Sequence, residues 1–144
     1  MLEKETEKLN LALIRGNKAY EKLNEKINIP GYLAFILHEL LLKKKLSQRE
    51  LVAMSDHPKQ SINKGIHLLE SKGYLRLVTL EKDNRVKSCR LTPKGQEYAK
   101  ALLSPVFKIE EQTAQIMGEE KMKQLTSLMQ EWNEIILKLL QEES

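Results

Sequence analysis

Apolar residues recur near both ends of the chain with the spacing of one helix face. Over residues 2–27, steps of four and three residues link Leu2, Thr6, Leu9, Leu13, Gly16, Tyr20, Leu23 and Ile27. Over residues 119–141, the same steps link Met122, Leu125, Met129, Trp132, Ile136 and Leu139. Such a seam packs against another helix. We therefore expect the two long helices to pack together and against a second copy of the chain; a bundle within one chain is the alternative.

The middle of the chain predicts shorter helices. Residues 32–45 are apolar almost all round, so this helix should be central to the core. A third helix opens at Ser47, which can form a capping box with Glu50. A fourth covers residues 58–72 and ends at Gly73, a residue suited to a left-handed helix end. The third and fourth helices have the lengths of a helix-turn-helix.

A hairpin and a long helical segment complete the order. Residues 75–91 predict two strands, because apolar and polar side chains alternate into and out of a polar tip. Thr92 caps a fifth helix that begins at Pro93, and Pro105 should kink or break that helix. Gly118 separates it from the last helix. The expected fold is mainly α with a small β-hairpin.

The charge of the chain is unevenly distributed. The net charge is only +4, but residues 43–100 hold 14 Lys and Arg against 6 Asp and Glu, while the rest of the chain holds 10 against 14. A basic middle between acidic ends is typical of a protein that binds a polyanion. Chance clustering on a solvated surface is the alternative.

The fourth helix has one apolar and one polar face. Ile62, Ile66 and Leu69 share a face that should lie on the core. The opposite face is polar, without an acidic residue before Glu70, and collects Gln60, Asn63, Lys64, His67 and Ser71, with Lys59 and Ser61 beside its start. Amide side chains can pair with adenine, and lysine with guanine or phosphate. We expect base contacts from Gln60, Ser61, Asn63 and Lys64; a merely soluble face is the alternative.

The hairpin places cations beside this helix, as the wing of a winged helix does. Arg85 at its tip suits the minor groove, where the negative potential favours arginine. Asp83 should hold Arg85 in position by accepting hydrogen bonds. Contacts with the DNA backbone are expected from the other cations of the helix start and the hairpin, namely Lys59, Arg76, Lys82, Lys87 and Arg90.

Three segments in this order resemble the MarR (multiple-antibiotic-resistance repressor) family of winged-helix regulators: "KQSINKGIHLLESKGYL", the tip Asp83-Asn84-Arg85, and "RLTPKG". The resemblance implies a winged helix-turn-helix module over residues 32–92. It implies a helical dimerisation region from residues 1–29 and 93–144. It also implies a homodimer, most simply a repressor, that reads palindromic double-stranded DNA with helix 58–72 in the major groove and hairpin 75–91 on the backbone and minor groove.

The same resemblance implies a small effector, aromatic or amphipathic. In the family arrangement, a ligand pocket would lie where the two modules join, lined by Leu13, Asn17, Tyr20, Tyr32, Phe35 and Ile36, with Arg15 as an anion partner. A filled core is the alternative, and it is the simpler one.

Other classes of protein find little support. The chain lacks the residue settings of an enzyme, a cofactor site or a phosphate loop. Its three histidines are scattered, so no metal site is expected, and Cys89 is interpreted as a partly buried strand residue rather than a sensor. Without a spanning segment, a signal peptide or a disulfide, a cytoplasmic protein is expected. A winged-helix scaffold for protein interactions, without specific DNA binding, remains the second hypothesis.

Overall fold

The computed structural model describes residues 1–80 and 83–143, and within these it describes the side chains outside residues 80–86. Residues Met1–Val106 and Phe107–Ser144 form two compact units. The two units differ from the predicted modules, because they are defined by compactness. The winged helix-turn-helix module over residues 32–92 stays a prediction.

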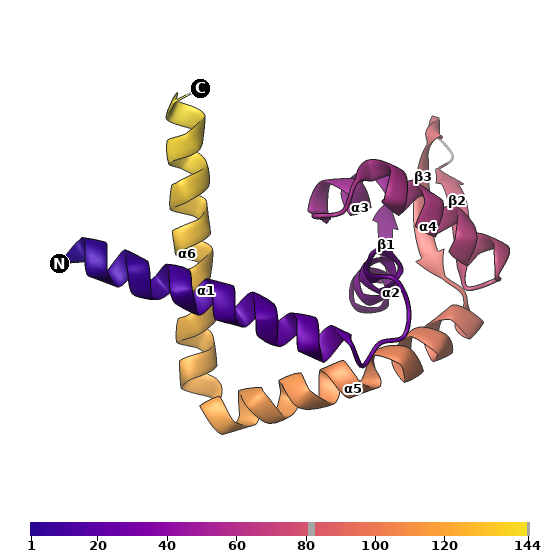
Figure 1. Cartoon of the computed structure of the whole chain (residues 1–144). Coiled ribbons are helices and arrows are strands. Elements are labelled where there is room, and N and C mark those ends of the chain that lie inside the picture. The colour runs from indigo at the N-terminus through magenta and orange to yellow at the C-terminus, as the bar shows by residue number, and fades with distance from the viewer. Residues whose placement is uncertain (81–82, 144) are drawn as a thin grey trace. The chain divides into compact units, whose positions relative to one another are not determined.

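The first unit is helical apart from one small sheet (Figure 1). Its elements are α1 (Leu2–Asn24), α2 (Gly31–Lys43), β1 (Lys45–Ser47), α3 (Gln48–Met54), α4 (Lys59–Ser71), β2 (Leu75–Leu80), β3 (Asp83–Leu91) and the first part of α5 (Pro93–Met117). This order confirms the predicted mainly α fold with a β wing.

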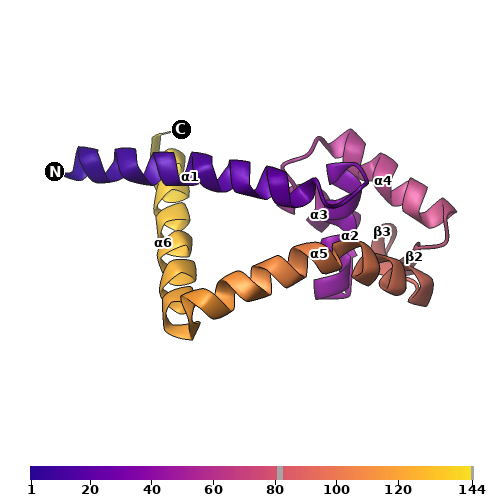
Figure 2. The same cartoon turned by 60° about the horizontal axis from the view of Figure 1, so that its bottom comes forward.

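Helix α2 is the centre of the core, as its apolar sequence predicts. It buries Leu33, Ile36, Leu37 and Leu40. Helix α4 packs closely against it, because a Cβ atom added at Gly65 would lie 2.7 Å from Cδ1 of Ile36. In Figures 1 and 2, α4 runs beside the strands, so its buried face covers both α2 and the sheet.

The sheet has three strands where the sequence predicted two. Its order is β1-β3-β2, and both pairs are antiparallel. The inner face contributes Leu46, Leu75, Cys89 and Leu91 to the core. Strand β1 was missed because its three residues, Lys-Leu-Ser, show no alternation long enough to detect; pairing with β3 creates the strand.

The wing is joined tightly to α5. Gly73 ends α4 with a φ of +80°, a left-handed conformation that glycine adopts without strain. The carbonyl of Tyr74 accepts a hydrogen bond from the Thr92 amide at 3.0 Å. The Thr92 hydroxyl donates to the Gly73 carbonyl and accepts from the Gly95 amide at 3.0 Å, which confirms it as the cap of α5. The rings of Tyr74 and Tyr98 stack with centroids 4.2 Å apart.

Several predicted boundaries need correction. Helix α1 ends at Asn24, not at residue 27, and α2 ends at Lys43, because Lys44 has a φ of 68° and leaves the helix. Pro105 does not break α5, which continues to Met117. The pyrrolidine ring removes one backbone donor, but the helix tolerates this loss.

The second unit contains the end of α5 and all of α6 (Glu119–Glu143), joined at Gly118 with a φ of +91°. The seam of α6 is confirmed as one helix face, but it is not covered: no residue of α6 is buried, and Leu125 and Leu139 are 49% and 55% exposed. Helix α1 of the first unit likewise buries none of its residues.

Candidate nucleic-acid interface and a neighbouring cavity

Helix α4 separates its two faces as predicted. Ile62, Ile66 and Leu69 are buried in the core. Gln60, Lys64, His67 and Ser71 are exposed, as is Lys59 in the first turn, while Ser61 and Asn63 are half-buried. Pro58 is the residue before the helix rather than its first residue. The exposed face therefore presents amides, a hydroxyl and two lysines to solvent.

The turn between α3 and α4 is held by its own side chains. The capping box of α3 is confirmed, since the Ser47 hydroxyl accepts from the Glu50 amide and the Glu50 carboxyl accepts from the Ser47 amide, both at 3.0 Å. At the other end of α3, the His57 amide donates to the Ser55 hydroxyl at 2.8 Å. The capping box fixes the start of α3, and the contact between Ser55 and His57 holds the turn that precedes α4.

Strand alternation divides the cations of the wing between two faces. Lys87 pairs with Thr79 on the face of Cys89, which is the face toward α4, and its side chain is exposed. Arg76 and Arg90 pair with each other on the opposite face. The prediction treated these cations as one set; the alternation that was already visible at Leu75, Leu77, Cys89 and Leu91 would have separated them.

The outer face of the sheet carries a row of three cations. Lys45 is opposite Arg90, and Arg90 is opposite Arg76. The Arg90 Nε atom is buried without a hydrogen-bond partner among the described residues. Like charges placed opposite one another destabilise a sheet, so this row is not explained by the stability of the sheet.

The tip of the wing lies largely outside the described residues. Lys82 is one of the three residues, with Glu81 and Ser144, that are not described. Asp83 and Arg85 belong to β3, but their side chains are among those left undescribed. Their roles in the minor groove therefore stay predictions.

Cys89 is fully buried, more so than predicted. Burial raises the pKa of its thiol from 9.0 to about 11, and the charge of Glu70 adds to this effect. A protonated, covered thiol is a poor nucleophile, which agrees with its interpretation as a structural residue.

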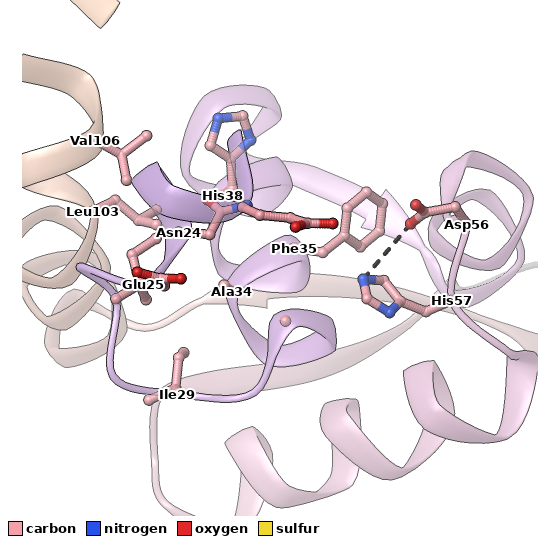
Figure 3. A pocket seen from close by; sticks show the side chains of 13 residues that line it. Asn24, Glu25, Ile29, Ala34, Phe35, His38, Asp56, His57, Leu103 and Val106 are labelled. Carbon is pink, nitrogen blue, oxygen red and sulfur yellow. Dashed lines mark ion pairs between the residues drawn. The ribbon is translucent and has the colours of Figure 1, made fainter. Parts of the chain in front are cut away.

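A cavity of about 570 Å³ lies beside the helix-turn-helix, within the first unit (Figure 3). Its lining residues come from the end of α1 and the segment after it, from α2, from the α3–α4 turn and from α5. Phe35 and His57 stand together on one wall, with ring centroids 6.2 Å apart. The His57 Nε2 atom is 3.6 Å from Asp56 Oδ1. Leu103 and Val106 contribute apolar surface from α5.

His38 on the cavity wall is held by its neighbour Glu39. The two side chains approach to 3.2 Å, and Lys43 donates to the same carboxyl group at 2.8 Å. Burial raises the pKa of Glu39, but the hydrogen bonds from Lys43 and His38 outweigh it, so the net shift is downward. Glu39 therefore keeps a negative charge behind the wall.

The structure brings only one of the six predicted pocket residues to this cavity, namely Phe35. Ile36 is fully buried in the core, and Tyr32 is half-buried against Gly65. Leu13, Asn17 and Tyr20 lie on exposed parts of α1. The acidic residues of the cavity were missed because they are far apart in the sequence and no local pattern links them.

Two further findings concern only the described residues. No three His, Cys, Asp or Glu side chains among them stand close enough to hold a metal ion. No helix in that part of the chain is both long and apolar enough to cross a membrane.

Comparison with known sequences bears on the helix-turn-helix and the wing directly. Residues 34–85, from within α2 to the wing, match the sequence model of the MarR family. This segment of the chain is therefore similar to the MarR family. The match runs from α2 through β2 and ends three residues into β3. Two of the segments that carried the resemblance lie within it, and "RLTPKG" lies after it, at residues 90–95. MarR family proteins are transcriptional regulators. No match is found among curated proteins.

Solved structures share the MarR fold over nearly the whole chain. A MarR family regulator from Neisseria meningitidis, NMB1585, superposes with a TM-score of 0.82 at 18% identity, covering 96% of this chain and 97% of that one. MepR from S. aureus in its DNA-binding conformation gives 0.71 at 16% identity, covering 91% and 97%. MarR from Staphylococcus aureus in complex with salicylate and kanamycin gives 0.68 at 23% identity, covering 96% and 94%. At these identities, the likeness shows the fold.

Proposed function

We propose that this chain is a MarR family regulator, namely a homodimeric transcriptional repressor that binds palindromic DNA. Helix α4 would enter the major groove, and the β2–β3 wing would lie on the backbone, with Arg85 in the minor groove. The observation that carries the proposal is the division of α4: its apolar residues are buried, while Gln60, Lys64 and the edge of Asn63 remain accessible beside the basic wing. Residues 32–92 would be the DNA-binding module.

Dimerisation is supported by the uncovered seams of α1 and α6. Apolar side chains on both helices are accessible, including Leu13 at 38% and Ile136 at 39% exposure. Exposed apolar patches of this kind mark association surfaces. In a dimer, two copies of α4 would reach successive major grooves about 10 bp apart. Residues 1–29 and 93–144 would supply the interface.

A small effector in the cavity beside the α3–α4 turn completes the proposal. The cavity lies within the roughly 300–1,000 Å³ range of ligand sites. The structure of the S. aureus relative in complex with salicylate and kanamycin makes ligand binding a reasonable expectation here. A regulator of this kind acts where DNA is, in the cytoplasm, and needs no catalytic group or cofactor.

The test is selection of bound duplexes from a random pool, followed by Asn63→Ala on the selected site. We expect a two-fold symmetric site with half-sites about 10 bp apart. The substitution should cost about 1–3 kcal/mol on that site and little on random DNA, because Asn63 is assigned to a base edge. Equal losses on both duplexes would assign Asn63 to the backbone instead.

The competing function, a scaffold for protein interactions, predicts a different result. A scaffold would show no electrostatic binding to random duplex even at low salt, whereas a DNA-binding regulator binds it with an affinity that falls as salt rises. Measuring that dependence by fluorescence anisotropy separates the two functions.

A further inference from the structure

The cavity beside the helix-turn-helix is lined by acidic side chains together with aromatic and apolar ones. Three acidic side chains stand around it: Glu21 and Glu25 near the end of α1, and Asp56 in the α3–α4 turn. None of its lining residues is Lys or Arg. The remaining surface is aromatic or apolar, with Phe35, Ile29 and Val106 among it. Figure 3 shows Glu25 and Phe35 on the same hollow, with the Asp56–His57 pair at its far side.

The charges of these lining residues disfavour the binding of an organic acid. A carboxylate placed in the cavity would meet three acidic groups and no lysine or arginine that could neutralise it. Salicylate, which is present in the structure of the S. aureus relative, is such an acid. An organic cation meets favourable partners instead, since carboxyl oxygens attract it and the face of Phe35 can stabilise it by a cation–π interaction.

We propose that the cavity binds an amphipathic organic cation, with its apolar body against Phe35, Leu103 and Val106 and its charge toward Glu25 and Asp56. The proposal rests on the proposed function only for its regulatory consequence. The expected class is an aromatic cation without a carboxylate or phosphate. This ligand class differs from the sequence-based expectation, in which Arg15 would pair with an aromatic acid.

A ligand in this place touches the residues that begin the recognition helix. Asp56 and His57 directly precede Pro58, the residue that caps α4. The His57 ring packs on Phe35 and lies 3.3 Å from where a Cβ of Gly31 would be, so the turn rests on the start of α2. A cation beside Asp56 competes with the His57 imidazole for that carboxyl group. The turn would then shift, α4 would be displaced in the major groove, and affinity for DNA would fall.

Two probes of nearly the same shape and opposite charge test the ligand class: tetraphenylphosphonium and tetraphenylborate. Titration calorimetry and melting of the full-length chain are measured with each. We expect the cation to bind and to raise the melting temperature, and the anion to bind more weakly or not at all. Equal or tighter binding of the anion, or no binding of either probe, overturns the proposal.

Glu25→Gln and Asp56→Asn locate the bound cation. Each substitution removes one acidic group at the solvent-accessible rim, and we expect roughly a threefold to tenfold loss of affinity for tetraphenylphosphonium. Glu7→Gln, on an exposed turn of α1 remote from the lining residues, is the matched control and should change nothing. If all three variants bind the cation like the parent chain, the cation sits elsewhere and the proposal fails.

Separate DNA measurements keep the two proposals distinguishable. Affinity for the selected duplex is measured without probe, then with tetraphenylphosphonium at about its dissociation constant for the parent chain. A loss of DNA affinity in the parent chain that is clearly smaller in the Glu25→Gln variant at the same probe concentration supports the regulatory link. Cation binding without any change in DNA affinity overturns the regulatory link but still supports the cation-binding site. A chain that binds no DNA in any condition refutes the proposed function, while calorimetry still decides the ligand class.

Discussion

Gly95 lies where a larger residue has no room. A Cβ atom at this position would come within 1.9 Å of the Tyr74 carbonyl oxygen, which is backbone and already accepts the Thr92 amide. The start of α5 therefore approaches the start of β2 more closely than any other residue type allows. In the sequence this glycine is part of "TPKG", but nothing there shows what it faces.

Replacing Gly95 with alanine should destabilise the fold. The added methyl group forces two backbone segments apart, and we expect a loss of about 3 kcal/mol in the free energy of unfolding, at the upper end for overpacking. Urea denaturation followed by circular dichroism measures it. Gln96→Ala, at the exposed neighbouring position, is the control and should change stability by less than about 0.5 kcal/mol. Equal free energies of unfolding for the two variants would mean that the backbone segments at Gly95 and Tyr74 can separate without destabilising the fold.

Cys89 should react only when the protein unfolds. Its thiol has a pKa of about 11 in the folded chain against 9.0 for an ordinary thiol, mainly because it is buried. Iodoacetamide at pH 9 should leave the native protein unmodified and label it in urea, as mass spectrometry can show. Between pH 9.0 and about 11 the unfolded chain loses a proton that the folded chain keeps, so the free energy of unfolding should fall as pH rises. Labelling of the native protein at the unfolded rate would contradict this burial.

At the scale of elements, local patterns predict helices well and short strands poorly. The capping box at Ser47 and the left-handed end at Gly73 were predicted because each is determined by a few neighbouring residues. Strand β1 depends on β3, more than forty residues away in the register Lys45–Arg90, so no local pattern could predict it. The close packing of α2 on α4 at Gly65 was missed for the same reason, since a missing side chain leaves no periodicity.

The two faces of the wing should differ in their contribution to DNA binding. Lys87→Ala should weaken binding to all sequences alike and lower the salt slope by about 1, because an exposed cation on the face toward α4 is well placed for phosphate. Arg76→Ala removes an exposed cation of the opposite face and should leave the slope unchanged. Anisotropy titrations at several salt concentrations measure both. The reverse order would mean that DNA lies against the outer face of the sheet.

At the scale of the whole molecule, the seams of α1 and α6 were predicted as helix faces, and both are present. What covers them was not predictable from the chain alone, because an apolar seam has the same sequence whether its partner is another helix of the same chain or of a second copy. The cavity was equally hidden, since its acidic residues lie on α1 and on a turn more than thirty residues later.

Charges placed on the α6 seam should separate a dimer. Leu125→Glu combined with Leu139→Glu puts two acidic groups on the accessible apolar face, and we expect light scattering to give the mass of one chain instead of two. Ser127→Glu, on the opposite side of the same helix, is the control and should stay dimeric. If the double variant keeps the mass of the parent, the interface does not involve this seam.

The junction at Thr92 has a mechanical consequence. One residue separates the end of β3 from the start of α5, and its amide and hydroxyl are both tied to the Gly73–Tyr74 backbone. No slack remains between the hairpin and the first turn of the helix. A torque applied to that turn is therefore transmitted to the hairpin and also to the end of α4, because the Gly73 amide donates to Glu70 and the Tyr74 amide donates to Leu69. The wing and the C-terminal end of the recognition helix should thus turn together when the first turn of α5 moves.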